Sequence, residues 1–109
     1  MANARIVLTT VGLLEKAEQL AAMLVERRLA ACVNIIGPIR SIYRWKGAIE
    51  REQEYLLLIK TSAERATDLA AAFAELHPYE IPEHVELAIE SGSHGYLQWL
   101  SEQVARDGS

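Results

Sequence analysis

A long hairpin dominates this sequence: residues 39–60 read IRSIYRWKGAIEREQEYLLLIK. β-branched and aromatic residues on both sides of Lys46-Gly47 predict two strands joined by a two-residue loop. A strand of about 13 residues spans about 43 Å, whereas a compact domain of this size has a radius of gyration of about 13 Å. We therefore expect the far half of the hairpin to project beyond the core.

The projecting half carries large apolar side chains, namely Ile42, Tyr43, Trp45 and Ile49. Burying one such side chain contributes about 1.5–3 kcal/mol, so the group has enough apolar surface to drive association. We predict a homo-oligomer in which the hairpin packs on a neighbouring chain. The alternative is a hairpin that bends at Gly37-Pro38 and folds back on its own sheet.

Outward from the hairpin, strand and helix patterns alternate along the chain. Residues 5–10 predict a buried strand, and the helical spacing of apolar residues over 13–29 predicts an amphipathic helix. A strand pattern over 30–45 is interrupted at Gly37-Pro38, where we expect a bulge or bend because proline cannot donate to a ladder.

Thr61 and Glu64 have the spacing of a capping box, which predicts the start of a second helix that ends near His77, before Pro78. A fourth strand is expected over 84–90, followed by a short C-terminal helix. The order βαββαβ with right-handed crossovers predicts an α+β, ferredoxin-like sandwich with a long protruding hairpin and an extra helix. No linker divides the chain, so we expect a single domain over residues 1–109.

Composition excludes several classes of protein. The 109 residues are 50% hydrophobic with a formal net charge of −4, which gives no basic surface for nucleic acid. The single cysteine, Cys32, allows no intrachain disulfide and favours a reducing compartment. No apolar run approaches the length of about 18 residues that a membrane span requires. We expect a cytoplasmic protein with no membrane or nucleic-acid partner.

Five motifs stand out along the chain, namely Leu29-Ala30-Ala31-Cys32-Val33-Asn34, Trp45-Lys46-Gly47, Lys60-Thr61, His77-Pro78-Tyr79-Glu80-Ile81-Pro82 and Tyr96-Leu97 before Trp99. In their order and spacing they resemble the CutA divalent-cation-tolerance family over nearly the whole chain. The resemblance implies a cytoplasmic homotrimer of ferredoxin-like subunits, similar to the PII signalling proteins, in which long hairpins join the sheets of neighbouring subunits. It also implies a role in tolerance of copper and other divalent cations, with no established catalytic activity.

The resemblance also identifies a candidate metal ligand. Copper binding in the family is associated with a cysteine near the end of the first strand and a His-His pair before the Pro-Tyr segment, which correspond here to Thr9, Leu76 and His77. His77 is thus the candidate for copper or another divalent cation. The thiol and imidazole groups of the chain match no local metal motif, so a strong site requires ligands shared between subunits. Alternatively, His77 binds the last carbonyls of the second helix.

A second candidate site involves Lys60, Tyr79 and Glu80. The loop between Pro78 and Pro82 is stiff, which suits binding. If Lys60 faces an intersubunit cleft together with Tyr79 and Glu80, the cleft can bind a small anionic effector, as the resemblance to PII-like trimers implies. The alternative is an interface ion pair between Lys60 and Glu54.

The remaining candidates belong to the expected trimer interface. Tyr43 and Trp45 alternate on one hairpin face, and Ile49 lies near them. Glu54 shares a strand face with two further glutamates that can receive arginines of a neighbour, and Trp99 is assigned to the core or the interface. An enzyme using Cys32 or His77 is a third hypothesis, but no orienting residue is indicated, so we expect a protein without catalytic activity.

Overall fold

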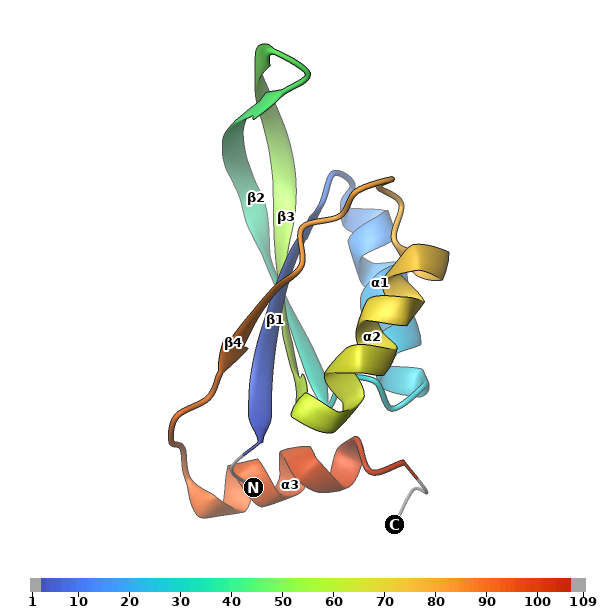
Figure 1. The fold of residues 1–109 in the computed structure, drawn as a ribbon, viewed down its shortest axis with the longest axis vertical. Coiled ribbons are helices and arrows are strands. Elements are labelled where there is room, and N and C mark those ends of the chain that lie inside the picture. Colours follow the sequence, from blue (N-terminus) through green and yellow to red (C-terminus); the bar gives the residue numbers. More distant parts are fainter. Residues whose placement is uncertain (1–2, 107–109) are drawn as a thin grey trace.

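The computed structural model describes residues 3–106, so both ends of the domain expected over residues 1–109 lie outside these limits. One antiparallel sheet with the strand order β2-β3-β1-β4 carries α1 and α2 on one face, and α3 lies across the end at which β1 begins (Figure 1). The elements are β1 (Ala4–Val11), α1 (Leu14–Glu26), β2 (Cys32–Trp45), β3 (Ala48–Ser62), α2 (Ala63–Leu76), β4 (Val85–Ala88) and α3 (His94–Gln103).

The expected α+β, ferredoxin-like order of elements is confirmed. The core lies between the sheet and the two helices. Every second residue of a strand faces the helices and packs on the apolar stripes of α1 and α2. The fourth strand is shorter than expected over 84–90, because β4 pairs only with Arg5–Leu8 of β1. Fully buried members of the core are Val7, Leu20, Leu24, Leu57, Ile59 and Leu69.

The hairpin projects as the sequence predicts. β3 pairs with β1 only over Tyr55–Ser62, so Ala48–Glu54 of β3 and Ile39–Trp45 of β2 pair with each other alone. We call this two-stranded part the distal ribbon. It accounts for much of the 46 Å long dimension and does not fold back on the sheet (Figure 1).

Two local features shape the hairpin. Lys46 and Gly47 form the predicted two-residue turn with φ values of +50° and +83°, as expected for a turn that matches the twist of the strands. The predicted irregularity lies between Ile36 and Ile39, where the pairing register shifts at Gly37-Pro38. A Cβ atom on Gly37 would lie 2.6 Å from Cδ2 of Tyr55, so this position has no room for a side chain.

The capping box predicted at Thr61 and Glu64 is wrong. Thr61 is fully buried and its hydroxyl donates to the carbonyl of Leu29 at 2.7 Å. The N-cap of α2 is Ser62, whose hydroxyl accepts from the backbone N–H of Arg65. Thr61 therefore ties β3 to the segment before β2, because a buried hydroxyl needs a partner and the Leu29 carbonyl supplies it.

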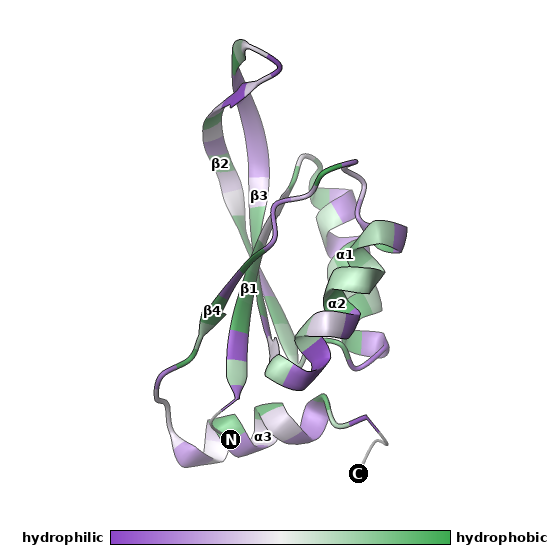
Figure 2. Cartoon of the chain, viewed as in Figure 1, coloured by the Kyte–Doolittle hydropathy of each residue, from purple (hydrophilic) through white to green (hydrophobic). Residues whose placement is uncertain are grey.

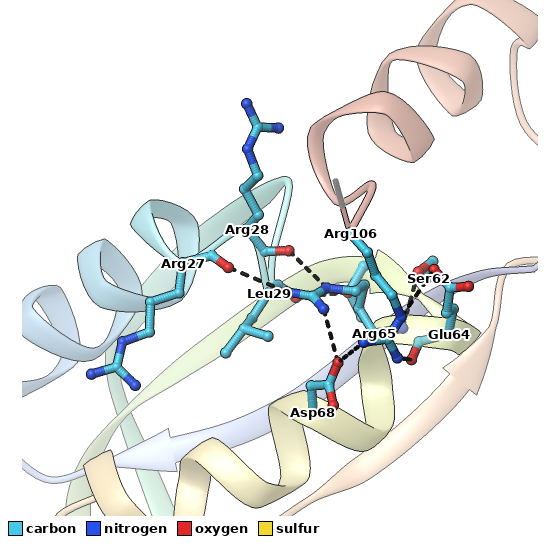
Figure 3. Close-up of polar contacts among 9 residues, drawn as sticks. Arg27, Arg28, Leu29, Ser62, Glu64, Arg65, Asp68 and Arg106 are labelled. Carbon is cyan, nitrogen blue, oxygen red and sulfur yellow. Dashed lines mark hydrogen bonds and ion pairs between the residues drawn. The ribbon is translucent and has the colours of Figure 1, made fainter. Parts of the chain in front are cut away.

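Arg65 connects the start of α2 to the end of α1 (Figure 3). Its guanidinium donates to the carbonyls of Arg27 and Arg28 at 3.3 and 3.2 Å and to Asp68 at 2.8 Å. The carbonyls at a helix C-terminus have no partners within the helix, and a cation there also interacts favourably with the helix dipole. Arg28 in turn donates to the carbonyl of Gln103 at the end of α3.

We expect Arg65→Ala to lower the free energy of unfolding by about 1.5–3 kcal/mol, because it removes three charged hydrogen bonds made by a side chain that is only 12% exposed. Arg106→Ala is the matched control, since Arg106 is half-exposed and its ion pairs to Glu64 and Asp68 lie at the surface. Urea unfolding at one protein concentration measures both. Equal losses for the two variants would contradict the role assigned to Arg65.

Candidate functional site

A cavity of about 850 Å³ lies between the distal ribbon and the loop 78–83 that follows α2. The ribbon contributes Tyr43, Trp45 and Glu54, and the loop contributes Tyr79 and Glu80. The structure thus brings five of the candidate residues together around one cavity. Its lining also includes Thr10, Ser41 and Glu83 and, among the described residues, no lysine or arginine.

Tyr79 and Glu54 close the inner end of this cavity. The Tyr79 hydroxyl donates to Oε2 of Glu54 at 2.7 Å. Burial, followed by this bond to a carboxylate, raises the pKa of Tyr79, so the hydroxyl remains a donor. A Cβ on Gly12 would lie 3.1 Å from the same hydroxyl, which leaves little room for a side chain there. The loop is therefore held against β3 by a partly buried polar contact.

His77 fixes the start of the loop. Its Nδ1 accepts the backbone N–H of Tyr79 at 3.1 Å, and its Nε2 lies 2.9 Å from the Thr9 hydroxyl. These contacts assign a neutral imidazole with its proton on Nε2. The suggestion that His77 binds the last carbonyls of α2 is wrong, because both ring nitrogens point to other partners.

The same contacts bear on His77 as a metal ligand. Its side chain is 8% exposed and neither nitrogen is free for coordination. Leu76, at the second family position, brings no donor group, and Thr9 brings a neutral hydroxyl where a thiolate is expected. Residues 3–106 contain no cluster of three or more His, Cys, Asp or Glu side chains that could hold a metal ion. The residues of one chain therefore do not fit a copper centre.

Lys60 lies away from the cavity within the chain. It pairs in register with Cys32, six residues along β3 from Glu54, and its ammonium donates to Oδ1 of Asn34. The subunit therefore brings together neither Lys60 with Tyr79 and Glu80 nor Lys60 with Glu54. The order of elements in the sequence placed Lys60 near the loop. That order does not specify at which end of the sheet a residue lies.

The other candidates lie elsewhere. Trp99 is on α3, where its ring packs against Tyr96 with centroids 5.6 Å apart, and 41% of its surface is exposed. Ile49 lies on the ribbon face opposite Glu54. Sequence reasoning missed the Thr9–His77 and Tyr79–Glu54 contacts, because pairs separated by 68 and 25 residues leave no local signal.

The comparisons with known proteins agree with this geometry. The family model described as CutA1 divalent ion tolerance protein matches residues 5–103. The divalent-cation tolerance protein CutA of Thermus thermophilus is 48% identical over 91% of this chain and 96% of its own length. Human protein CutA is 46% identical over 77% of this chain, which spans only 47% of the human protein.

Solved structures are similar over nearly their whole length. The T. thermophilus Cut A1 structure has a TM-score of 0.90 at 46% identity, covering 94% of this chain and 99% of that one. CutA1 of Oryza sativa has a TM-score of 0.92 at 35% identity and covers 95% of each chain. The long hairpin is thus part of a shared fold.

Burial of the imidazole lowers the pKa of His77 from its ordinary value of 6.5. Below pH 6.5 the unfolded chain therefore binds a proton that the folded chain does not, and stability falls as the pH drops toward the folded-state pKa. We expect His77→Gln to flatten this part of the stability profile between pH 6.5 and 5, as measured by urea unfolding. His94→Gln, at an exposed histidine, serves as the control, and an unchanged slope in His77→Gln would contradict the assignment.

Proposed function

Because the chain belongs to the CutA1 divalent ion tolerance protein family, we propose that it acts in divalent-cation tolerance as a cytoplasmic homotrimer without catalytic activity. The observation that carries the proposal is the distal ribbon, which exposes four large hydrophobic side chains. Ile42 is 65% exposed and Ile49 47%, and Tyr43 and Trp45 are each 41% exposed. An isolated two-stranded ribbon is marginal in water, so a neighbouring subunit is expected to cover it.

The sheet supports self-association as well. Its face opposite α1 and α2 exposes Ile36, Val85 and Leu87, and hydrophobic colour runs along β1 and β4 in Figure 2. β2 and β4 are edge strands with unpaired backbone groups on their outer sides. Open edges and apolar faces are the surfaces through which sheets join between subunits. The number three rests on the family resemblance.

We propose that divalent cations bind the assembled protein weakly and reversibly rather than at a closed centre in one subunit. The imidazole of His77 is engaged in the fold, so cation binding falls to exposed carboxylates and to ligands that neighbouring subunits share. Hard divalent cations accept such oxygen ligands, whereas tight copper sites use imidazole and thiolate. An anionic effector in the cavity is not part of the proposal, because Glu54, Glu80 and Glu83 line it without a cationic residue.

The cytoplasmic placement rests on the single unpaired cysteine, Cys32. No helix within residues 3–106 has the length and apolar character needed to cross a membrane. Relatives are named for other compartments: the Arabidopsis thaliana protein is called chloroplastic, and the Archaeoglobus fulgidus structure is titled periplasmic. Fractionation of the native host separates these possibilities for this chain.

Native mass spectrometry with and without one equivalent of copper or zinc per chain tests the proposal. We expect a trimer that loses added metal on buffer exchange, in the parent protein and in His77→Ala alike. Stoichiometric metal that is retained by the parent and lost in His77→Ala would contradict the weak-binding proposal. A monomer at micromolar concentration would contradict the assembly.

The double variant Ile42→Ser/Ile49→Ser tests the role of the distal ribbon. We expect it to shift the protein toward the monomer in sedimentation velocity, because it removes two exposed apolar side chains from the surface assigned to the neighbour. Leu13→Ser is the control, since Leu13 is 63% exposed but lies at the start of α1. Circular dichroism verifies folding, and an unchanged trimer in the double variant would exclude the ribbon as a main contact.

A further inference from the structure

Charges on the distal ribbon are segregated between its two faces. Residues directly opposite in an antiparallel pair share a face. Glu54 is opposite Ile39, Glu52 opposite Ser41 and Glu50 opposite Tyr43, and the pair Trp45 and Ala48 completes this face. We call it the carboxylate face.

The other face holds every arginine of the ribbon. Arg40 is opposite Gln53, Arg51 opposite Ile42, and Arg44 opposite Ile49. We call this the arginine face. All three arginines are exposed, and none of them forms an ion pair with a carboxylate among the described residues. Because the arginines and the glutamates lie on opposite faces, those of one ribbon cannot form ion pairs with each other across the strands.

Glu54 is a buried carboxylate of the carboxylate face without a cationic partner among the described residues. The residue is only 6% exposed, and its one hydrogen-bond partner among the described residues is the neutral Tyr79 hydroxyl on Oε2. No lysine, arginine or histidine of residues 3–106 lies within ion-pair distance of it. A buried carboxylate without a cationic partner is costly, and its side chain lines the cavity.

The neighbouring carboxylates make the cavity more negative still. Partial desolvation and the nearby carboxylates of Glu52, Glu54 and Glu50 raise the pKa of Tyr43, as expected where the negative charges gather on one face. Glu80 and Glu83 of the loop add to the same side. Tyr43, Trp45 and Tyr79 supply aromatic rings on which a guanidinium can stack.

We propose that the carboxylate face of each distal ribbon packs on the arginine face of the next copy, so that a neighbour's arginine enters the cavity and pairs with Glu54. This inference rests on the homotrimer of the proposed function and specifies its contact. The ribbon supplies both halves of the interface from different faces, which makes the contact heterologous. Heterologous contacts close into a ring when the rotation between copies returns to the first one, as in a trimer, whereas a two-fold dimer would place like charges against each other.

Charge reversal on each face tests the contact. Glu50→Arg/Glu52→Arg makes both faces positive, and Arg44→Glu/Arg51→Glu makes both negative. We expect each double variant to raise the midpoint concentration of trimer dissociation at least about tenfold, because like charges then meet across the interface. The fourfold variant that combines them exchanges the two faces, and we expect it to recover most of the lost affinity.

Recovery of trimer affinity in the fourfold variant distinguishes this contact from other reasons why the double variants would assemble weakly. If the fourfold variant is as weak as the two double variants combined, or if both double variants assemble like the parent, the faces do not meet and the proposal is overturned. In either case the parent remains a trimer and the proposed function stands. A parent that is monomeric overturns the proposed function itself.

Glu54→Gln tests the proposal through the direction in which trimer stability changes. Glutamine removes the negative charge but keeps an oxygen that accepts the hydrogen bond from Tyr79. We expect the variant to weaken the trimer, because it leaves a neighbour's arginine unpaired in the cavity. Strengthening instead would show that Glu54 has no cationic partner, and would overturn the proposal. Glu18→Gln, at an exposed glutamate of α1 without an ion pair among the described residues, controls for the loss of one charge. Sedimentation velocity measures both variants.

Discussion

The structure depends on the difference in length between β3 and its neighbour β1. β3 has 15 residues, whereas β1 has 8, so half of the hairpin extends past the sheet that the core supports. Near the core, α1 and α2 pack on one face of the sheet, as is usual for this class of fold. The distal ribbon differs, because apart from the loop 78–83 no layer of the described residues covers its faces, and its edges are open (Figure 1). In the proposed assembly, a second copy covers its exposed side chains.

The loop after α2 links the two halves of the subunit. His77 and Thr9 anchor its start below the sheet, and Tyr79 reaches Glu54 at the base of the distal ribbon. The same small network that shapes the cavity occupies the imidazole on which a family-type copper centre would depend. In this chain the position is used for structure, and Leu76 and Thr9 are consistent with that use.

The periodicity of residues 5–29 and 48–76, together with the Lys46-Gly47 turn, was enough to predict the order of elements and the projecting hairpin. These features are local, and the physics that specifies them acts between near neighbours. The capping box was wrong because Thr61 finds a buried partner, Leu29, 32 residues away. Lys60 lies apart from Tyr79 within the subunit for a similar reason: the order of elements shows which strands are adjacent, whereas register decides which strand ends meet. Glu54 and Glu80 of the cavity were recognised as candidates from the sequence, whereas Glu83 and the burial of Glu54 became evident only from the fold.

The open edges of the distal ribbon have a consequence for the newly made chain. Before it meets its partners, each subunit presents an extended two-stranded template on which other strands can pair. The charged residues of both strands oppose such pairing, since stacked identical segments would bring like charges into register. We therefore expect the arginines and glutamates of the ribbon to reduce aggregation of the newly made chain. A sequence that replaced them with threonine and valine would keep the strand propensity and lose that protection.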